Sequence, residues 1–313
     1  MAVDLPRCSG PPVTALPEIV AAQDQLLTEL NAVFLENESA GGRVAYCLSD
    51  AKMTNGLNGL SFGFNQYDLR RNSNAASILA DILEKAHAAN PELSLSQADI
   101  DSIRAGKLSF AANSLSAIVD ETLGKLLNDV DAALSTAAAR RAINERYIDS
   151  LRNDVATLDT EVSALSETVR AKSYLSTNRL GRLVLLDYEN FLGHMGRQFK
   201  SYLNGEMVTL KAGTISISGA ASFTDIMRFY LATKQGAGAN RDERAEVLRR
   251  LNNVVKQSEA IEGAAALAES DKAYLSGSLA DILSDPDNPF IKAKRVSGQY
   301  RSLEKLIDRA RVA

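Results

Sequence analysis

Two glutamates and the glycine-rich segment after them carry the residues best suited to chemistry. Glu36 and Glu38 end a stretch of helical periodicity, and residues 41–68 then combine five glycines with Ser61 and Asp68. Glycosidic bond cleavage needs an acid that protonates the leaving oxygen and a second polar group that steers water or stabilises positive charge. Glu38 with Ser61 or Asp68 could supply both. The alternative is that the glutamates are solvated helix-end residues and that the glycines only form turns.

The chain offers few other catalytic groups. Its only histidines are His87 and His194, and its only cysteines are Cys8 and Cys47. His87 lies near the end of a helical stretch that Pro91 closes, so we expect it at the surface. Two cysteines without CxxC or Cys/His spacing predict free thiols rather than a disulfide framework or a zinc site. Histidine catalysis, a bound metal and a cofactor are therefore not expected.

Composition indicates a folded protein of one or two domains. The chain has 313 residues, of which 45% are hydrophobic and 24% charged, close to the average for globular proteins. Its net charge of -4 argues against nucleic acid as a partner, because phosphate contacts need an excess of Lys and Arg. No basic segment precedes an apolar run, and no apolar run reaches the length of a membrane span. Neither a Sec signal nor a membrane anchor is expected.

Helices are expected to position the candidate residues. After a loose leader, residues 1–16, apolar spacing predicts helices over 17–37, 73–90, 180–202, 222–234, 241–258 and 296–311. Ser73 is the expected cap of the second helix, and Ser96 with Asp99 predicts a capping box. Residues 36–68 predict turns and short strands, and residues 207–218 predict a hairpin. The fold class is therefore mainly α (α+β), with a small β region near the N-terminus.

A further helical segment has the spacing of a coiled coil. From Ile148 to Val169 the apolar residues alternate three and four apart for about three heptads. Packing against residues 115–134 of the same chain, in an antiparallel hairpin, is favoured over an intermolecular coil. We therefore expect a long helical hairpin inserted at about 110–172.

The order of the motifs resembles that of phage-type lysozymes and the related pesticin-like and endolysin domains. In that family a Glu at the end of the first helix precedes a Gly, an Ala-Tyr pair and a hairpin of the form Gly-x-Thr-Ile-Gly-x-Gly-x-Asp-Leu. Here Glu38, Gly41 or Gly42, Ala45-Tyr46 and Gly59–Leu69 stand in that order. Weaker matches extend the resemblance over most of residues 17–258: they are Leu183–Asn190, Phe229–Gly236 and Arg249–Asn253.

The resemblance implies a lysozyme-like fold. Residues 17–258 would form the catalytic domain, with the helical insert at about 110–172, and residues 259–313 would form a C-terminal helical extension. This chain departs from the family pattern in three places. Ser61 replaces the usual Thr, one extra residue precedes Asp68, and no Asp stands shortly before the hydroxyl unless Asp50 serves.

The resemblance also implies an activity: a muramidase that cleaves peptidoglycan between N-acetylmuramic acid and N-acetylglucosamine. Glu38 would be the general acid, and Ser61 would hold a water or a sugar hydroxyl. Asp68 would orient that water or stabilise the developing charge. The implied sugar-binding residues are the amides Gln66 and Asn190 and the rings Tyr46 and Tyr188. For each of these four, a turn, helix-end or core residue is the alternative.

Other functions remain open from the sequence. A lytic transglycosylase needs only a glutamate and leaves anhydro ends, although the second carboxylate favours hydrolysis. A non-enzymatic alternative is a helical structural protein that assembles through the coiled-coil segment.

The enzyme hypothesis also carries an expectation about location. A phage endolysin, a secreted toxin or a cell's own remodelling enzyme would be made in the cytoplasm without a Sec signal and would act in the periplasm or on the cell wall. A holin or a contact-dependent secretion machine would export it. Peptidoglycan is then the expected partner, with secretion machinery or an immunity protein as a second one.

Overall fold

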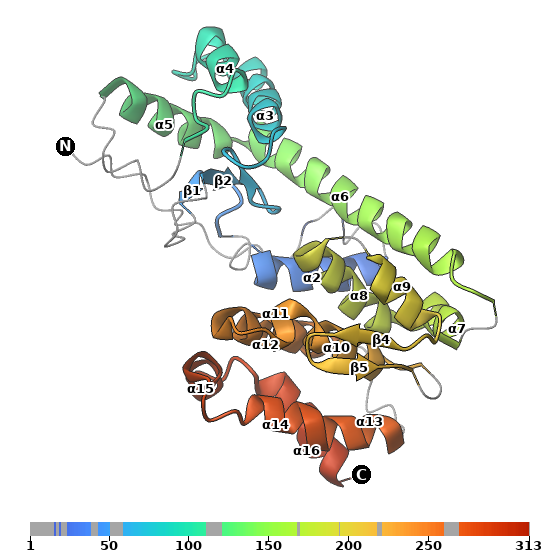
Figure 1. The fold of residues 1–313 in the computed structure, drawn as a ribbon. Helices are drawn as coiled ribbons and strands as arrows, with labels where there is room; N and C mark the ends of the chain where they lie inside the picture. Colours follow the sequence, from blue (N-terminus) through green and yellow to red (C-terminus); the bar gives the residue numbers. More distant parts are fainter. Residues whose placement is uncertain are drawn as a thin grey trace. The chain divides into compact units, whose positions relative to one another are not determined.

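The computed structural model describes residues 16, 19, 24–38, 43–50, 59–110, 121–167, 170–193, 195–217, 221–259 and 269–312. These residues are mainly helical and include two small antiparallel sheets, which confirms the coarse fold class (Figure 1). The chain divides into two compact units. Unit 1 consists of residues 1–23 and 34–151, and unit 2 consists of residues 24–33 and 152–313.

Unit 1 contains a sheet of three very short strands. These are β1 (Ser49–Asp50), β2 (Leu60–Phe62) and β3 (Tyr67–Asp68), antiparallel in that order. The turn between β2 and β3 uses left-handed backbone at Gly63, with φ 73°, and at Gln66, with φ 48°. The sequence correctly predicted turns and short strands in this region.

Three helices of unit 1 follow the sheet. They are α3 (Ala75–Ala89), α4 (Gln97–Arg104) and α5 (Glu121–Leu134). The predicted capping box at α4 is confirmed, because Asp99 N donates to Ser96 Oγ and Ser96 N donates to Asp99 Oδ2, each at 3.2 Å.

The start and the end of α3 can be compared with two predictions, the cap Ser73 and the surface position of His87. The helix is preceded by Asn74 rather than by the predicted cap Ser73, because residues 72–74 form a turn in which Asn74 N donates to Asn72 Oδ1 at 3.0 Å. His87 lies in the last turn of the helix, as expected, and is half-buried.

The helix predicted over residues 17–37 is confirmed from residue 25 onward as α2 (Gln25–Glu38). Asp24 caps it, because Leu27 N donates to Asp24 Oδ1 at 3.1 Å. Of the earlier part of the prediction only Ile19 and Asp24 are described, and Ile19 is buried, as is Leu16 just before it. The remaining residues before Asp24 lie outside the described part of the chain.

The expected antiparallel hairpin is wrong. α5 packs on α3, and α6 (Ala137–Ser163) continues from α5 in nearly the same direction (Figure 1). Helix-like hydrogen bonds run through the junction: Ser135 N donates to Asp131 O, and Arg140 N donates to Thr136 O. The two residues between α5 and α6, Ser135 and Thr136, do not have the left-handed backbone that commonly ends a helix. The chain therefore continues as helix instead of reversing its direction.

The apolar seam of α6 is nevertheless buried within its own chain. Ile148, Leu151 and Leu158 are at most 3% exposed. Residues up to Leu151 belong to unit 1 and residues from Arg152 to unit 2. The helix ends at Ser163, so the predicted seam is shorter than expected, and Val169 lies outside the described residues.

Unit 2 continues with α7 (Arg170–Thr177), α8 (Arg179–Leu192), α9 (Arg197–Leu203) and the hairpin of β4 (Val208–Leu210) and β5 (Gly213–Ile215). The hairpin was predicted at this place. The single helix predicted over 180–202 is wrong, because Gly193, with φ 88°, ends α8. Left-handed backbone of this kind does not fit inside a helix.

The remaining helices of unit 2 are α10 (Phe223–Ala232), α11 (Lys234–Ala237), α12 (Arg241–Glu259), α13 (Glu269–Tyr274), the π-helical turn η2 (Leu275–Leu279), α14 (Ala280–Leu283), α15 (Pro289–Val296) and α16 (Arg301–Val312). α10 and α12 confirm two predicted helices. The helix predicted from residue 296 begins five residues later as α16, because Gly298, with φ 76°, makes a turn after α15.

A buried ion pair lies at the centre of unit 2. Asp187 on α8 and Arg250 on α12 are 0% and 2% exposed, and the Arg250 Nη2 to Asp187 Oδ1 distance is 2.8 Å. Arg250 Nε donates to Asp187 Oδ2 at 3.2 Å, and the guanidinium lies 4.7 Å from the centre of the Phe191 ring. The Tyr230 hydroxyl donates to Asp187 Oδ2 at 3.4 Å. The pair is therefore bidentate and contacted by two aromatic side chains.

The buried seam of α6 gives the first prediction. Leu158→Asp should lower the free energy of unfolding by about 4 kcal/mol, because it places an unpaired charge at a fully buried position. Asn153→Asp adds the same charge at an exposed position of the same helix and should change it by less than about 0.5 kcal/mol. Urea unfolding measures both; a Leu158 variant as stable as its control would contradict the burial.

Candidate functional site

The proposed acid lies at the end of α2. Glu38 is the last residue of this helix and is half-buried, whereas Glu36 is exposed. Because the helix includes both residues, their side chains point about 200° apart. The two glutamates therefore have different surroundings, as the sequence predicted. Ser39 to Gly42, which follow, lie outside the described residues.

Three polar residues line up across the sheet. Ser61 on β2 stands opposite Ser49 on β1 and opposite Asp68 on β3. Residues opposite each other on antiparallel strands project from the same face, with Cβ atoms roughly 5 Å apart. We call Ser49, Ser61 and Asp68 the polar row. The structure thus brings two predicted catalytic residues together, and it adds Ser49, which only the strand register identifies.

Asp68 has a structural function as well as a place in the polar row. Its Oδ1 accepts hydrogen bonds from the backbone N–H groups of Gly59 at 3.0 Å, Arg70 at 2.8 Å and Arg71 at 3.1 Å. A Cβ on Gly59 would lie 2.7 Å from Arg70 Cβ, so only glycine fits this close approach. Within the described residues, Oδ2 of Asp68 is the oxygen left for a water or a substrate.

Gln66 is engaged at both ends of its amide. Its Nε2 donates to Gly63 O at 2.8 Å, and its Oε1 accepts from Ser49 Oγ at 2.8 Å. These bonds explain how the side chain stabilises a turn whose backbone is left-handed at a non-glycine residue. They favour the turn alternative for Gln66. Ser61 is 3% exposed, so Asp68, which is half-buried, is the more accessible of the two predicted catalytic residues in the sheet.

Tyr46 attaches the segment before β1 to α6. Its hydroxyl donates to Asn144 Oδ1 at 2.6 Å. Its ring meets Phe64 edge-on at 5.5 Å, and the Arg140 guanidinium lies 5.0 Å from the ring centre. These contacts favour the core-packing alternative over a sugar platform.

The other two predicted sugar-binding residues belong to unit 2. Tyr188 on α8 is buried, and its ring makes edge contacts with Phe199, Phe229 and Tyr230. Burial raises the pKa of its hydroxyl to about 12. Its position favours the core alternative. Asn190, near the end of the same helix, is exposed.

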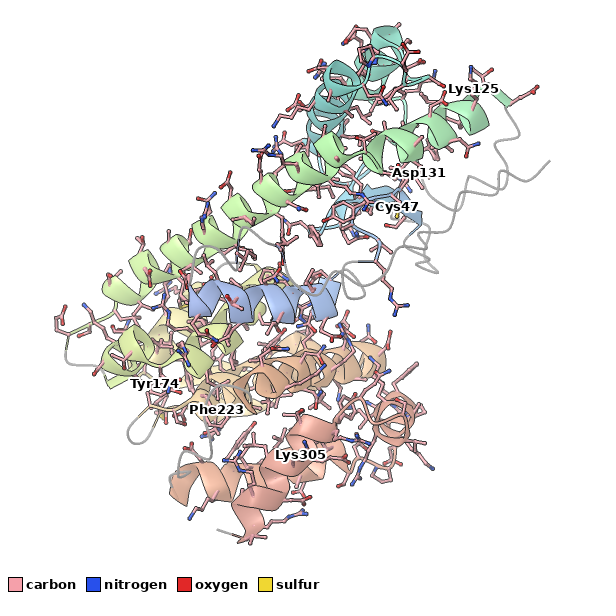
Figure 2. The ribbon with its side chains drawn as sticks, turned by 180° about the vertical axis from the view of Figure 1, so that it is seen from behind. Cys47, Lys125, Asp131, Tyr174, Phe223 and Lys305 are labelled. Atoms are coloured by element: carbon pink, nitrogen blue, oxygen red, sulfur yellow. The ribbon has the colours of Figure 1, made fainter. Side chains whose placement is uncertain are left out.

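A buried carboxyl on α5 holds the chain where it enters the sheet. Asp131 is 7% exposed, and its Oδ1 accepts from Leu48 N at 2.7 Å. Its Oδ2 is buried and has no hydrogen-bond partner among the described residues. Burial raises the pKa of Asp131 to about 6, although the bond from Leu48 opposes the shift. Figure 2 labels Asp131 on α5 and Cys47 on the segment that it holds.

The expectation of free thiols is wrong for Cys47. This residue is disulfide-bonded. The only other cysteine of the chain is Cys8, which lies outside the described residues. Cysteine spacing alone gave no sign of this bond, because a disulfide depends on which residues the fold brings together.

A pair of carboxyl groups in unit 2 was missed by the sequence analysis. Glu189 on α8 is hydrogen-bonded to Glu161 on α6. Burial, and then the neighbouring Glu161, raise the pKa of Glu189 to about 8. Lys200 Nζ lies 3.2 Å from Glu161 Oε1. Two carboxyl groups thus lie close together between α6 and α8, and their proximity keeps the proton on Glu189 to higher pH. Two residues 28 positions apart give no sequence signal for such a pair.

Among the described residues, no three His, Cys, Asp or Glu side chains are grouped so that they could hold a metal ion. In the same part of the chain, no helix has the length and apolar character needed to cross a membrane.

Comparison with protein-family models, curated proteins and solved structures gave no match.

The second prediction concerns Asp131. Its folded-state pKa, about 6, lies above the ordinary 3.8, so the unfolded chain releases this proton first. The free energy of unfolding should therefore fall by about 2–3 kcal/mol as the pH rises from about 4 to about 6. Asp131→Asn should abolish this part of the decrease and be more stable than the unsubstituted protein at pH 8.

Thermal unfolding at a series of pH values measures the effect. Asp129→Asn, two residues earlier on α5, is the matched control and should keep the pH dependence of the unsubstituted protein. If Asp131→Asn loses stability with pH as steeply as this control does, the buried carboxyl is not the cause.

Proposed function

We propose that this chain is a muramidase with a lysozyme-like fold. The observation that carries the proposal is the direct pairing of Ser61 with Asp68, in a small sheet that follows a helix ending in Glu38. The three residues proposed for catalysis from the sequence thus lie in one compact unit. The mainly helical fold with a small sheet after α2 also supports the proposal.

Each residue has a defined role in the proposed reaction. Glu38 donates its proton to the glycosidic oxygen as the bond from the anomeric carbon to that oxygen breaks. Asp68, through Oδ2, stabilises the positive charge and orients the water that adds to the anomeric carbon. That water gives a proton to the ionised Glu38, which restores the acid, and its remaining hydroxyl forms the new bond to the anomeric carbon. Ser61, nearly fully buried, positions Asp68 across the strand pair and does not contact sugar itself.

The four predicted sugar-binding residues differ in how exposed their side chains are and in how many contacts they make within the chain. Asn190 is exposed and belongs to unit 2, and its sugar-binding role stays a prediction from the sequence. Gln66 and Tyr46 are held by contacts within unit 1, and Tyr188 is buried. For these three, a supporting role is better founded than sugar contact.

The disulfide at Cys47 supports action outside the cytoplasm. Disulfides persist in the periplasm and in secreted proteins, whereas cytosolic thiols are kept reduced. This agrees with an enzyme that is made in the cytoplasm, exported and active on peptidoglycan. Secretion machinery or an immunity protein remains a proposed second partner.

No observation favours the structural alternative. It relied on an apolar seam available to another chain, and the seam residues Ile148, Leu151 and Leu158 are buried in this one. Within the enzyme class, a lytic transglycosylase would use Glu38 alone, whereas the place of Asp68 beside Ser61 supports hydrolysis.

The third prediction identifies the acid. Glu38→Gln, nearly isosteric but without an acidic proton, should lower turnover on purified peptidoglycan by about 10² or more. Glu36→Gln, a matched change at an exposed position of the same helix, should change turnover by less than about twofold if it contributes no acid catalysis. Release of soluble fragments measures turnover, and circular dichroism checks that both variants fold. An inactive Glu36 variant would move the acid by two residues, and full activity in both would overturn the assignment.

A further inference from the structure

Charge is unevenly distributed along this acidic chain. Residues 289–313 contain seven Lys and Arg but only two Asp and Glu, a net charge of +5. Because the whole chain carries -4, the other residues together carry -9. The basic residues lie on two helices at the end of unit 2, α15 and α16.

On α16 the basic residues form a row. Arg301, Lys305 and Arg309 are spaced by four residues, so they lie within about 80° of arc on one face. All three are exposed, and Figure 2 labels Lys305 on this helix. Val312, 90% exposed, falls on the same arc. The opposite face of the helix is buried through Leu303, Leu306, Ile307 and Ala310. These residues pack the helix onto unit 2, so its packing does not depend on the basic row.

α15 adds a second set of exposed residues. Lys292 and Val296 are four positions apart, and Val296 is 84% exposed. Phe290, at the start of the helix, is 47% exposed. Arg295 Nε donates to Glu304 Oε1 of α16 at 2.7 Å, so the two helices are joined by an ion pair. We call the exposed residues of α15 and α16 the basic-apolar surface.

The helices α15 and α16 also carry most of the exposed large hydrophobic side chains. The large hydrophobic residues with high exposure in the described chain are Met207, Phe290, Val296 and Val312. Three of these four belong to the basic-apolar surface. Exposed aliphatic and aromatic side chains between Lys and Arg are typical of surfaces that meet an anionic bilayer, where the charges face the headgroups and the apolar side chains enter the interface.

We propose that the basic-apolar surface docks on an anionic phospholipid bilayer. The proposal does not depend on the muramidase hypothesis. Two acidic side chains of the same helix reduce the charge only in part: Glu304 pairs with Arg295, and Asp308 Oδ1 lies 3.7 Å from Arg311 Nη1. A purely polyanionic partner would use the basic row but would gain nothing from Val296 and Val312, which are 84% and 90% exposed, so these apolar residues favour lipid.

Vesicle co-sedimentation of the full chain tests the proposal. The protein should bind vesicles of phosphatidylcholine mixed with phosphatidylglycerol, should not bind pure phosphatidylcholine, and should be released by salt. A variant with Arg301, Lys305 and Arg309 all changed to Gln should bind about 100-fold more weakly, from about 5-fold per side chain. Val296→Ser should weaken binding without any change in charge.

A matched control separates local from net charge. Lys107, Lys211 and Lys234 are exposed and lie outside α15 and α16, and changing all three to Gln removes the same charge. This control should bind within about twofold of the unsubstituted protein, since distant charges are screened. Equal loss in both triple variants, no binding to anionic vesicles, or binding to soluble dextran sulfate with no effect of Val296→Ser would each overturn the proposal.

Discussion

The sheet that carries the candidate site cannot hold itself together. Strands of two or three residues are too short for independent stability, so β1, β2 and β3 depend on side chains from elsewhere in unit 1. Asp131 holds the backbone at Leu48, the Tyr46 hydroxyl donates to Asn144, and Phe64 stacks on Tyr147 at 4.6 Å. The positions of Ser61 and Asp68 are therefore set by α5 and α6 as much as by the strands.

Unit 2 depends in the same way on Asp187 and Arg250. Removing either partner would leave an uncompensated charge in the core, which typically costs about 3–5 kcal/mol. Both residues lie in the segments Leu183–Asn190 and Arg249–Asn253, which resemble family motifs. Their contacts give these segments a structural explanation: the pair fixes α8 against α12. A motif match can thus reflect packing rather than substrate contact.

Structural features that depend on neighbouring residues were predicted well from the sequence. Features that depend on contacts between distant residues were not. The Ser96–Asp99 capping box and the hairpin of β4 and β5 depend on neighbouring residues, and both are confirmed. The direction of α6 after α5 depends on hydrogen bonding at one junction, so periodicity alone gave the wrong hairpin.

The same distinction applies to the candidate site. Ser49 joins the polar row only through strand register, and Glu161 meets Glu189 only through helix packing.

Muramidase activity can be measured directly by incubating purified peptidoglycan with the unsubstituted protein and analysing the products. Hydrolysis should release soluble muropeptides with reducing ends, identified by mass spectrometry. Intact sacculi, or products with only anhydro ends, would contradict hydrolysis by this chain.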